Sequence, residues 1–249
     1  MLKVPDMSSH AITVIIEAHR GDSANAPENT LSAFRRALDL GADSIELDVH
    51  PALDGTLMVI HDSTLDRTTN GTGAIQTKTV EQLRRLDAGT WLAPEFADEK
   101  IPSLEEVFTL LAGSRTNLNI EIKASPSGFN VPRALVNLLR RFGRERDYIV
   151  SSFNLQALLE VRKIEPQMQL ALIGKGPQIL PQAKLHGLPW IHGEFSTVDK
   201  PLIEAAHALG MRVNIWTMDD PSRFAYWKGI GVDKICTNCP SKMLAAAGV

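Results

Sequence analysis

Five residues of this sequence have side chains suited to acid–base or metal chemistry, and each falls within or at the end of a short apolar run: His19, Glu46, Asp48, His61 and Glu121. An imidazole titrates near neutral pH, so a pair of histidines can accept one proton and donate another. A single histidine at the end of a strand is more often structural. Two of them, each beside a charged residue, favour the interpretation of His19 and His61 as catalytic residues.

The carboxylates indicate a metal site. Glu46 and Asp48 are two residues apart in an expected strand, so their side chains point the same way. Burial of neighbouring carboxylates is costly because they lose hydration and repel each other. Ion pairs with Arg or Lys would resolve that cost for an isolated pair. With Glu121 as a third carboxylate, we favour one divalent cation, and ligation by oxygen alone suits Mg²⁺ or Ca²⁺.

Three further residues are predicted to bind substrate or its phosphate: Arg20, Lys123 and Trp216. The guanidinium of Arg20 can offer paired donors to a phosphate, although a salt bridge to a nearby carboxylate is almost equally expected. Lys123 can stabilise charge on a phosphoryl oxygen while it pairs with a carboxylate. Trp216 is expected to wall a pocket, with ordinary packing as the alternative.

The elements that must position these residues alternate along the chain. Apolar, β-branched runs predict strands over 13–17, 44–49, 57–60, 118–122, 148–151, 169–173, 190–193, 213–216 and 232–236. Amphipathic spacing predicts helices over 30–40, 80–86, 107–111, 132–142, 155–164, 177–184, 200–209, 221–228 and 240–247. About eight β-then-α units predict a closed α/β barrel, whose active site lies at the carboxyl ends of the strands.

The alternation is interrupted once. Asp54-Gly55 predicts a hairpin before 57–60, and residues 62–102 contain no long apolar strand. Ser103 and Glu106 form a capping-box pattern where the alternation resumes. We therefore expect a single domain over 1–249 with an insertion at about 62–102.

Composition narrows the function classes. The chain has 249 residues, of which 44% are hydrophobic and 22% charged, with a formal net charge of -3. This charge does not favour nucleic acid or an anionic membrane surface. The apolar run near the N-terminus is too short for a membrane span, so we expect no stable membrane insertion and a cytoplasmic location. Cys236 and Cys239 form a C-x-x-C, which we interpret as two reduced thiols in a loop. The sequence does not indicate an oligomeric state.

The motifs, taken in order, resemble the glycerophosphodiester phosphodiesterase family. They are His19-Arg20-Gly21, Pro27-Glu28-Asn29-Thr30, Glu46-Leu47-Asp48-Val49, Val59-Ile60-His61-Asp62, Leu65-Asp66-Arg67-Thr68-Thr69, Ile101-Pro102-Ser103-Leu104, Glu121-Ile122-Lys123, Ser152-Phe153 and Asn214-Ile215-Trp216-Thr217. The resemblance implies a TIM (β/α)8 barrel with a small insertion after the second strand region. It also implies hydrolysis of glycerophosphodiesters to glycerol 3-phosphate and an alcohol.

By the same resemblance, the metal ligands are Glu46, Asp48 and Glu121, and the acid–base pair is His19 and His61. Glu17 is not a fixed feature of the family and is left out of the site. One departure is Asn238, where the family usually has Asp. We expect that loop near the barrel mouth, with an effect on substrate choice rather than catalysis.

Three alternatives remain. A lysophospholipase D-like, metal-dependent phosphodiesterase would show apolar or basic anchors near the mouth, and the insertion offers Trp91, Leu92 and Phe96. A non-catalytic sugar-phosphate-binding barrel would lack one of the histidines or ligands. An unrelated aldolase or isomerase barrel would show a Schiff-base lysine or a late glycine-rich phosphate loop, and neither is apparent.

Overall fold

A closed barrel of parallel strands forms the centre of the computed structural model, which describes residues 13–123, 128–143 and 148–249. The barrel strands are β1 (Ile15–His19), β2 (Ser44–Pro51), β4 (Asn117–Ile122), β5 (Ile149–Ser152), β6 (Gln169–Gly174), β7 (Trp190–Glu194), β8 (Arg212–Trp216) and β9 (Lys234–Thr237). Neighbouring strands pair in the order β1-β9-β8-β7-β6-β5-β4-β2, and β1 also pairs with β2, which closes the barrel. The predicted (β/α)8 fold is confirmed.

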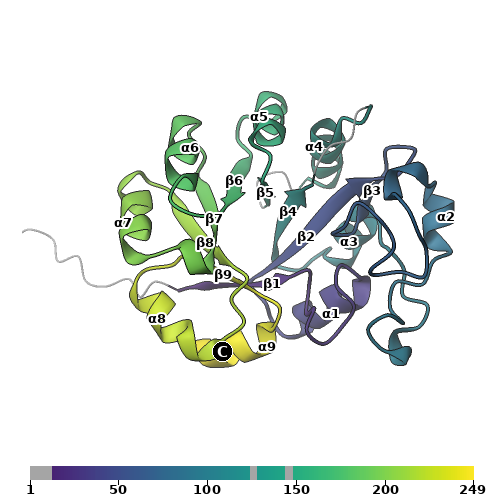
Figure 1. The fold of residues 1–249 in the computed structure, drawn as a ribbon, viewed down its shortest axis with the longest axis horizontal. Coiled ribbons are helices and arrows are strands. Elements are labelled where there is room, and N and C mark those ends of the chain that lie inside the picture. The colour runs from purple at the N-terminus through teal and green to yellow at the C-terminus, as the bar shows by residue number, and fades with distance from the viewer. Residues whose placement is uncertain (1–12, 124–127, 144–147) are drawn as a thin grey trace, which may run out of the picture.

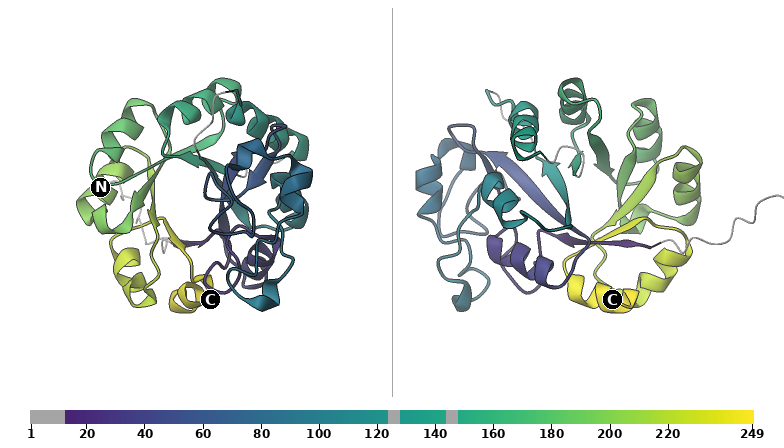
Figure 2. Two further views of the ribbon diagram at one scale, coloured as in Figure 1. Left: turned by 45° about the vertical axis from the view of Figure 1, so that its right-hand side comes forward. Right: turned by 180° about the vertical axis from the view of Figure 1, so that it is seen from behind.

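Helices cover the outside of these strands, as Figures 1 and 2 show. They are α1 (Leu31–Asp39), α3 (Leu104–Leu110), α4 (Val131–Phe142), α5 (Leu155–Ile164), α6 (Ile179–Leu185), α7 (Lys200–Ala208), α8 (Phe224–Gly229) and α9 (Pro240–Ala247), with the 3-10 turns η3 (Phe195–Thr197) and η4 (Pro221–Arg223). Each helix buries an apolar stripe against the strands; in α4 this stripe contains Leu135, Val136 and Leu139. The main hydrophobic core therefore lies between the strands and the helices.

The interruption at 62–102 lies between a hairpin and α3. Strand β3 (Leu57–Val59) pairs antiparallel with β2, as the Asp54-Gly55 turn predicted. The segment that follows contains η1 (Ile75–Thr77), α2 (Val80–Arg84) and η2 (Pro94–Phe96). It encloses a small hydrophobic cluster of its own, made by Ala52, Met58, Ile60, Leu65, Ile75, Leu83, Ala88 and Ile101. In Figure 1 it lies beside β2 and β3, at the edge of the barrel.

Several boundaries differ from the prediction. β1 begins two residues later than expected and continues through His19, because His19 pairs with Glu46 on β2. The helix expected at 221–228 is divided, since Asp220 accepts a hydrogen bond from the backbone of Ser222 and so starts a 3-10 turn before α8. The predicted capping box of Ser103 and Glu106 is confirmed.

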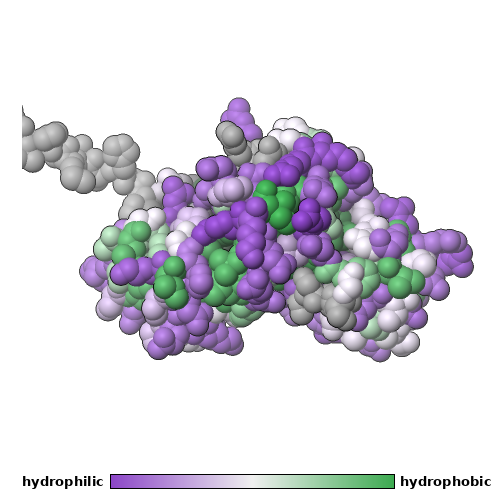
Figure 3. All heavy atoms as spheres, turned by 90° about the horizontal axis from the view of Figure 1, so that it is seen from above, coloured by the Kyte–Doolittle hydropathy of each residue, from purple (hydrophilic) through white to green (hydrophobic). Residues whose placement is uncertain are grey.

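No helix in the described part of the chain is long and apolar enough to cross a bilayer. Figure 3, which views the molecule from above relative to Figure 1, shows a face on which hydrophilic residues dominate. Hydrophobic residues form small separate groups on that face.

Candidate active site

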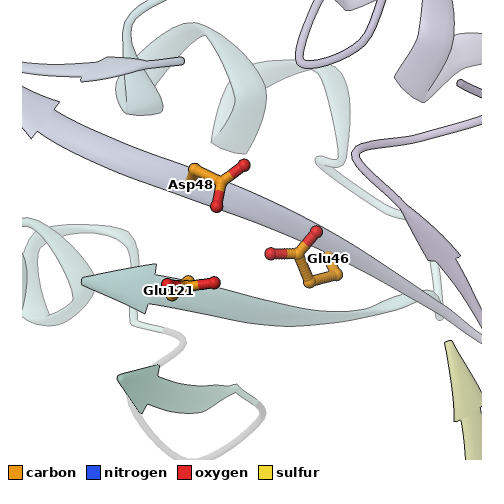
Figure 4. Close-up of side chains that lie close together, drawn as sticks. All are labelled: Glu46, Asp48 and Glu121. Carbon is orange, nitrogen blue, oxygen red and sulfur yellow. The ribbon is translucent and has the colours of Figure 1, made fainter. Parts of the chain in front are cut away.

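Three carboxylates converge at the carboxyl end of the barrel. Glu46 and Asp48 project from β2 and Glu121 from β4, and the register places Asp48 directly beside Glu121. One oxygen from each residue lies within 4.8 Å of the others, and all three side chains are buried. Figure 4 shows the carboxylates turned toward one another. The alternation of side chains along β2 produces this arrangement, because residues two apart share a face.

The loop after β1 is folded tightly beside this cluster. Arg20 and Asn29 have positive φ angles of 56° and 60°, and Gly21 has 83°. A Cβ atom on Gly21 would lie 2.6 Å from the backbone carbonyl carbon of Ala33, so glycine is required at this close approach. Asn29 Nδ2 then donates to Asp48 Oδ2 over 2.8 Å. The next residue, Thr30, caps the N-terminus of α1.

Two cationic side chains face the three carboxylates. Lys123 Nζ lies 3.0 Å from Asp48 Oδ1 and 2.7 Å from Glu121 Oε1. Arg20 Nε lies 3.4 Å from Asp48 Oδ2, and the Arg20 backbone N–H donates to Glu46 Oε2 over 3.1 Å. Arg20 and Lys123 were expected either to bind phosphate or to pair with a carboxylate. Each pairs with a carboxylate at the edge of the pocket, a position from which it can also bind a phosphate. The cluster nevertheless carries more acidic than basic groups.

Burial and the neighbouring charges shift the pKa values of these carboxyl groups in opposite directions. Burial, followed by the charges of Asp48 and Glu121, raises the pKa of Glu46 well above its ordinary value. Burial and the neighbouring Asp48 raise the pKa of Glu121 to about 7. Burial also disfavours ionised Asp48, but Lys123 and Arg20 outweigh it and hold the pKa of Asp48 well below its ordinary value. A buried cluster of oxygen ligands with unbalanced charge fits a divalent cation.

His61 is held by a carboxylate. Its Nδ1 lies 2.6 Å from Asp62 Oδ1. A hydrogen bond from Arg67 lowers the pKa of Asp62 to about 2, so Asp62 is ionised and accepts a hydrogen bond from Nδ1–H of His61. Arg67 also binds both oxygens of Glu28, which in turn pairs with Arg20. Burial lowers the pKa of His61 itself.

His19 has different partners from His61. Its Nε2 is 3.9 Å from Glu46 Oε2, and its Nδ1 is 2.7 Å from Asn238 Oδ1. Burial and the charge of Arg20 lower the pKa of His19 to about 4. The loop containing Asn238 thus reaches the site directly, although the two residues are 219 positions apart in the sequence. The sequence located this loop near the mouth but contained no sign of the contact.

A cavity of about 130 Å³ joins these groups. Seven of the eight residues predicted for the site line it: His19, Arg20, Glu46, His61, Glu121, Lys123 and Trp216. Asp48 does not line the cavity but contacts its walls through Arg20 and Lys123. The Trp216 indole donates to the His192 carbonyl and meets the exposed Phe153 ring edge-on at 5.6 Å. The structure therefore brings all eight residues into one site.

A ring of buried polar side chains, which we call the floor, lies below this site: Glu17, Ser44, Asn119, His192, Asn214 and Lys234. Glu17 accepts from Lys234 over 2.7 Å and from Asn214 over 2.8 Å. Burial alone would raise the pKa of Glu17, but Lys234 and His192 lower it to about 2. Glu17, which the family resemblance left out of the site, lines the cavity together with Asn119. The available signal was the spacing of Glu17 and His19, which share one face of β1.

Both cysteines are free thiols. Cys236 is buried within β9 rather than in a loop, which corrects the expectation for that residue. Burial, with the charges of Glu17 and Glu46, raises the pKa of Cys236 well above its ordinary value, so the thiol is protonated at neutral pH. Cys239 precedes α9, as the predicted loop position requires.

Residues 19–242 match the model of the glycerophosphoryl diester phosphodiesterase family. This chain belongs to that family. The predicted resemblance and the predicted enzyme class are confirmed. A glycerophosphodiester phosphodiesterase from Caldanaerobacter subterraneus subsp. tengcongensis is 37% identical over 233 residues, which cover 92% of this chain and 96% of that protein. A second relative, named a putative glycerophosphodiester phosphodiesterase, from Bacillus subtilis is 35% identical over 90% of this chain and 94% of its own length.

Solved structures of the family have the same fold. An Oleispira antarctica phosphodiesterase in complex with the product sn-glycerol-3-phosphate superposes with a TM-score of 0.89 at 29% identity, covering 94% of this chain and 97% of that one. A glycerophosphodiester phosphodiesterase from Agrobacterium tumefaciens superposes with a TM-score of 0.83 at 32% identity, covering 95% and 100%. The barrel and its insertion are thus a family architecture.

Proposed function

We propose that the protein hydrolyses glycerophosphodiesters to glycerol 3-phosphate and an alcohol. The observation that carries this proposal is the convergence of three carboxylates, two histidines and two cationic side chains on one small cavity. The complex of the Oleispira antarctica relative with sn-glycerol-3-phosphate supports a glycerol-linked product.

Glu46, Asp48 and Glu121 would hold one divalent cation, Mg²⁺ or Ca²⁺. When bound, such a cation supplies positive charge to the phosphate oxygens and orients the diester for in-line displacement. The three residues present only carboxylate oxygens, the donors that both ions prefer. Because Lys123 and Arg20 do not balance the charge of the cluster, a further cation is also favourable before substrate arrives.

Arg20 and Lys123 orient the phosphate from the two sides of the carboxylate cluster. Each is already fixed by an ion pair, so little side-chain freedom is lost when the phosphate binds. Their charges oppose the negative charge that accumulates on the phosphoryl oxygens during displacement.

The two histidines divide the proton transfers. Nε2 of His19 accepts a proton from the attacking oxygen, because a pKa of about 4 keeps this imidazole neutral at neutral pH. The attacking oxygen belongs either to water or to the glycerol 2-hydroxyl, in which case water then opens the cyclic phosphate. Nε2 of His61 donates a proton to the leaving alcohol, and the ionised Asp62 stabilises the protonated imidazole before transfer. This assignment gives His19 the role of base and His61 the role of acid.

The floor offers polar groups to the glycerol moiety. In the described part of the chain, the side-chain oxygens of Asn119 and Asn214 accept no hydrogen bond, and both residues line the cavity. A buried acceptor without a donor is costly, so glycerol hydroxyl groups that donate to these oxygens would gain binding energy. Trp216 and the exposed Phe153 would contact the alcohol group at the mouth.

A substrate panel tests the proposal. Glycerophosphodiesters with choline, ethanolamine or glycerol head groups are assayed beside lysophospholipids, in Mg²⁺, in Ca²⁺ and in EDTA. We expect cation-dependent release of glycerol 3-phosphate, which EDTA abolishes and which the His61→Ala variant loses. Activity restricted to lysophospholipids would support the lysophospholipase D-like alternative, for which the exposed Phe153 could serve as an acyl-chain contact. Turnover that EDTA does not affect would overturn the cation assignment.

The remaining assignments stay predictions of the sequence. We propose a single domain over 1–249, a small-molecule substrate, no nucleic-acid partner and no stable membrane insertion. We also propose action in the cytoplasm, where both thiols would stay reduced. Fractionation of cells that produce the protein tests the location.

A further inference from the structure

Asn238 forms a bridge between His19 and the carboxylate of Asp219. Its Oδ1 lies 2.7 Å from Nδ1 of His19. Its Nδ2 donates to Asp219 Oδ2 over 2.7 Å, and its backbone N–H donates to Asp219 Oδ1 over the same distance. Asp219 lies in the loop after β8, while Asn238 directly follows β9, so the bridge joins two neighbouring barrel loops.

The chemistry of Asp219 determines which way the Asn238 amide faces. An ionised carboxylate only accepts hydrogen bonds, so the NH₂ group of Asn238 must point toward Asp219. The amide oxygen must then point toward His19, and an amide oxygen also only accepts. Nδ1 of His19 must therefore carry the hydrogen, which leaves Nε2 without one and facing Glu46.

We propose that Asp219 and Asn238 are a positioning pair that fixes the tautomer and the ring orientation of His19 for its role as base. This inference rests on the proposed function of His19, but the tautomer itself can be measured without turnover. The contact with His19 replaces our expectation from the sequence that the Asn238 loop affects substrate choice rather than catalysis. The partner of His61 is a carboxylate, which favours a protonated ring. The partner of His19 is a neutral amide, which fixes the position of the hydrogen without adding a negative charge.

Further hydrogen bonds hold the bridge in place. Thr237 Oγ1 donates to Asp219 Oδ1 over 2.9 Å. The backbone N–H of Ala24 donates to the Asn238 carbonyl over 3.0 Å, and Ser23 Oγ lies 3.0 Å from Asn238 Oδ1. The loops after β1, β8 and β9 are thus tied together around His19. This rigidity is what a base needs, since a small displacement of the accepting nitrogen slows proton transfer.

The test first removes the amide of Asn238, and then exchanges the amide and the carboxylate between positions 219 and 238. Asn238→Leu keeps the size of the side chain and removes both amide groups. We expect kcat to fall on the order of 10–100-fold, the usual cost of losing a partner that orients a histidine, with KM nearly unchanged. Asn238→Asp places two carboxylates face to face and should also lose activity at pH 8. In the double variant D219N/N238D, the amide introduced at position 219 donates to the carboxylate introduced at position 238. That carboxylate accepts from His19 and restores the Nδ1–H tautomer, so part of the lost kcat should return. The return should be incomplete, because its negative charge favours the protonated ring more than the parent amide does.

A spectroscopic measurement separates this proposal from the proposed reaction. The ¹⁵N chemical shifts of the His19 ring should report a single Nδ1–H tautomer in the parent protein and a mixture in Asn238→Leu. Asp220→Asn is the matched control. Asp220 neighbours Asp219, but among the described residues its side chain hydrogen-bonds only Ser222, so the activity of this variant should be that of the parent. Thermal unfolding of every variant shows whether the fold is kept.

Two results would overturn the positioning role. One is an Asn238→Leu variant with the parent kcat and the parent tautomer. The other is a folded double variant that is no more active than Asn238→Asp. If the tautomer changes as expected but glycerophosphodiesters are not hydrolysed by the parent, the positioning pair stands and the proposed reaction fails.

Discussion

The floor and the mouth of the barrel carry charge in different ways, although the same strands build both. At the floor, Glu17 faces Lys234 at 2.7 Å, one acidic group against one basic group. At the mouth, Glu46, Asp48 and Glu121 face two cationic side chains. The two layers are separated by only two residues along each strand, as Glu17 and His19 are along β1.

This difference assigns the floor to the stability of the fold and the carboxylate cluster at the mouth to the binding of a cation. Burial of a charge is tolerated when a partner of opposite charge compensates it, so the ion pair of the floor can remain ionised without a ligand. The mouth lacks that compensation, and the raised pKa values of Glu46 and Glu121 show the cost. A cluster that folding leaves uncompensated is therefore suited to bind a cation, and the floor below it provides a rigid support.

The largest effect is expected from the loss of a carboxylate at the mouth. Glu121→Gln removes a negative charge from the proposed cation site, and we expect kcat/KM to fall on the order of 10³-fold, or about 4 kcal/mol. Steady-state assays in saturating Mg²⁺ or Ca²⁺ measure it. Glu95→Gln, an exposed carboxylate of the insertion, is the control and should have parent activity. Parent activity in Glu121→Gln would remove this residue from the site.

Substitutions in the floor should change the free energy of unfolding more than the activity. Lys234→Met leaves Glu17 buried without its partner, which typically costs about 3–5 kcal/mol. Urea unfolding measures this change. In the double variant E17Q/K234M both charges are absent, and we expect it to recover most of the loss. If Lys234→Met and the parent have the same unfolding free energy, the floor is not an essential ion pair.

The lowered pKa of Glu17 in the floor should make the free energy of unfolding depend on pH. The pKa of Glu17 is about 2 in the folded protein, against an ordinary value of 4.5. A lowered folded pKa contributes stability above pH 4.5 that is lost as the pH falls toward 2, here about 3 kcal/mol. E17Q/K234M lacks this contribution, so its unfolding free energy should fall less than that of the parent over this range. Equal slopes for the two proteins would contradict the lowered pKa.

The smallest effect is a gain of stability at the mouth. Because the pKa of Glu46 is raised, its ionised form destabilises the fold at neutral pH in the absence of a cation. Glu46→Gln should therefore be more stable than the parent in EDTA by about 1 kcal/mol. Saturating Mg²⁺ or Ca²⁺ should stabilise the parent more than the variant, and this would reverse the order. Thermal unfolding of Glu46→Gln and of the parent, in EDTA and in saturating cation, measures this order. A variant less stable than the parent in EDTA would contradict the conclusion that the charge of the carboxylate cluster is uncompensated.

Much of the site could be predicted from local spacing. Glu46 and Asp48 share a face because the period of a strand is two residues, and no distant contact is needed for that conclusion. His61 lies beside its partner Asp62 in the chain, so its environment was visible in the sequence too. The β-then-α order placed the strand ends, and with them Glu121 and Lys123, at one end of a barrel.

The sequence by itself thus determined the fold class, the eight candidate residues and the kinds of chemistry they can do. Only the tertiary structure decided which partner each group has. Barrel closure brings β1 beside β9, and this puts Asn238 against His19 across 219 positions and Lys234 against Glu17 across 217. Periodicity carries no information about such distant pairs, because it reports which face a side chain takes and not what lies opposite. Those pairs set the tautomer of His19 and the charge state of Glu17, which local sequence leaves open.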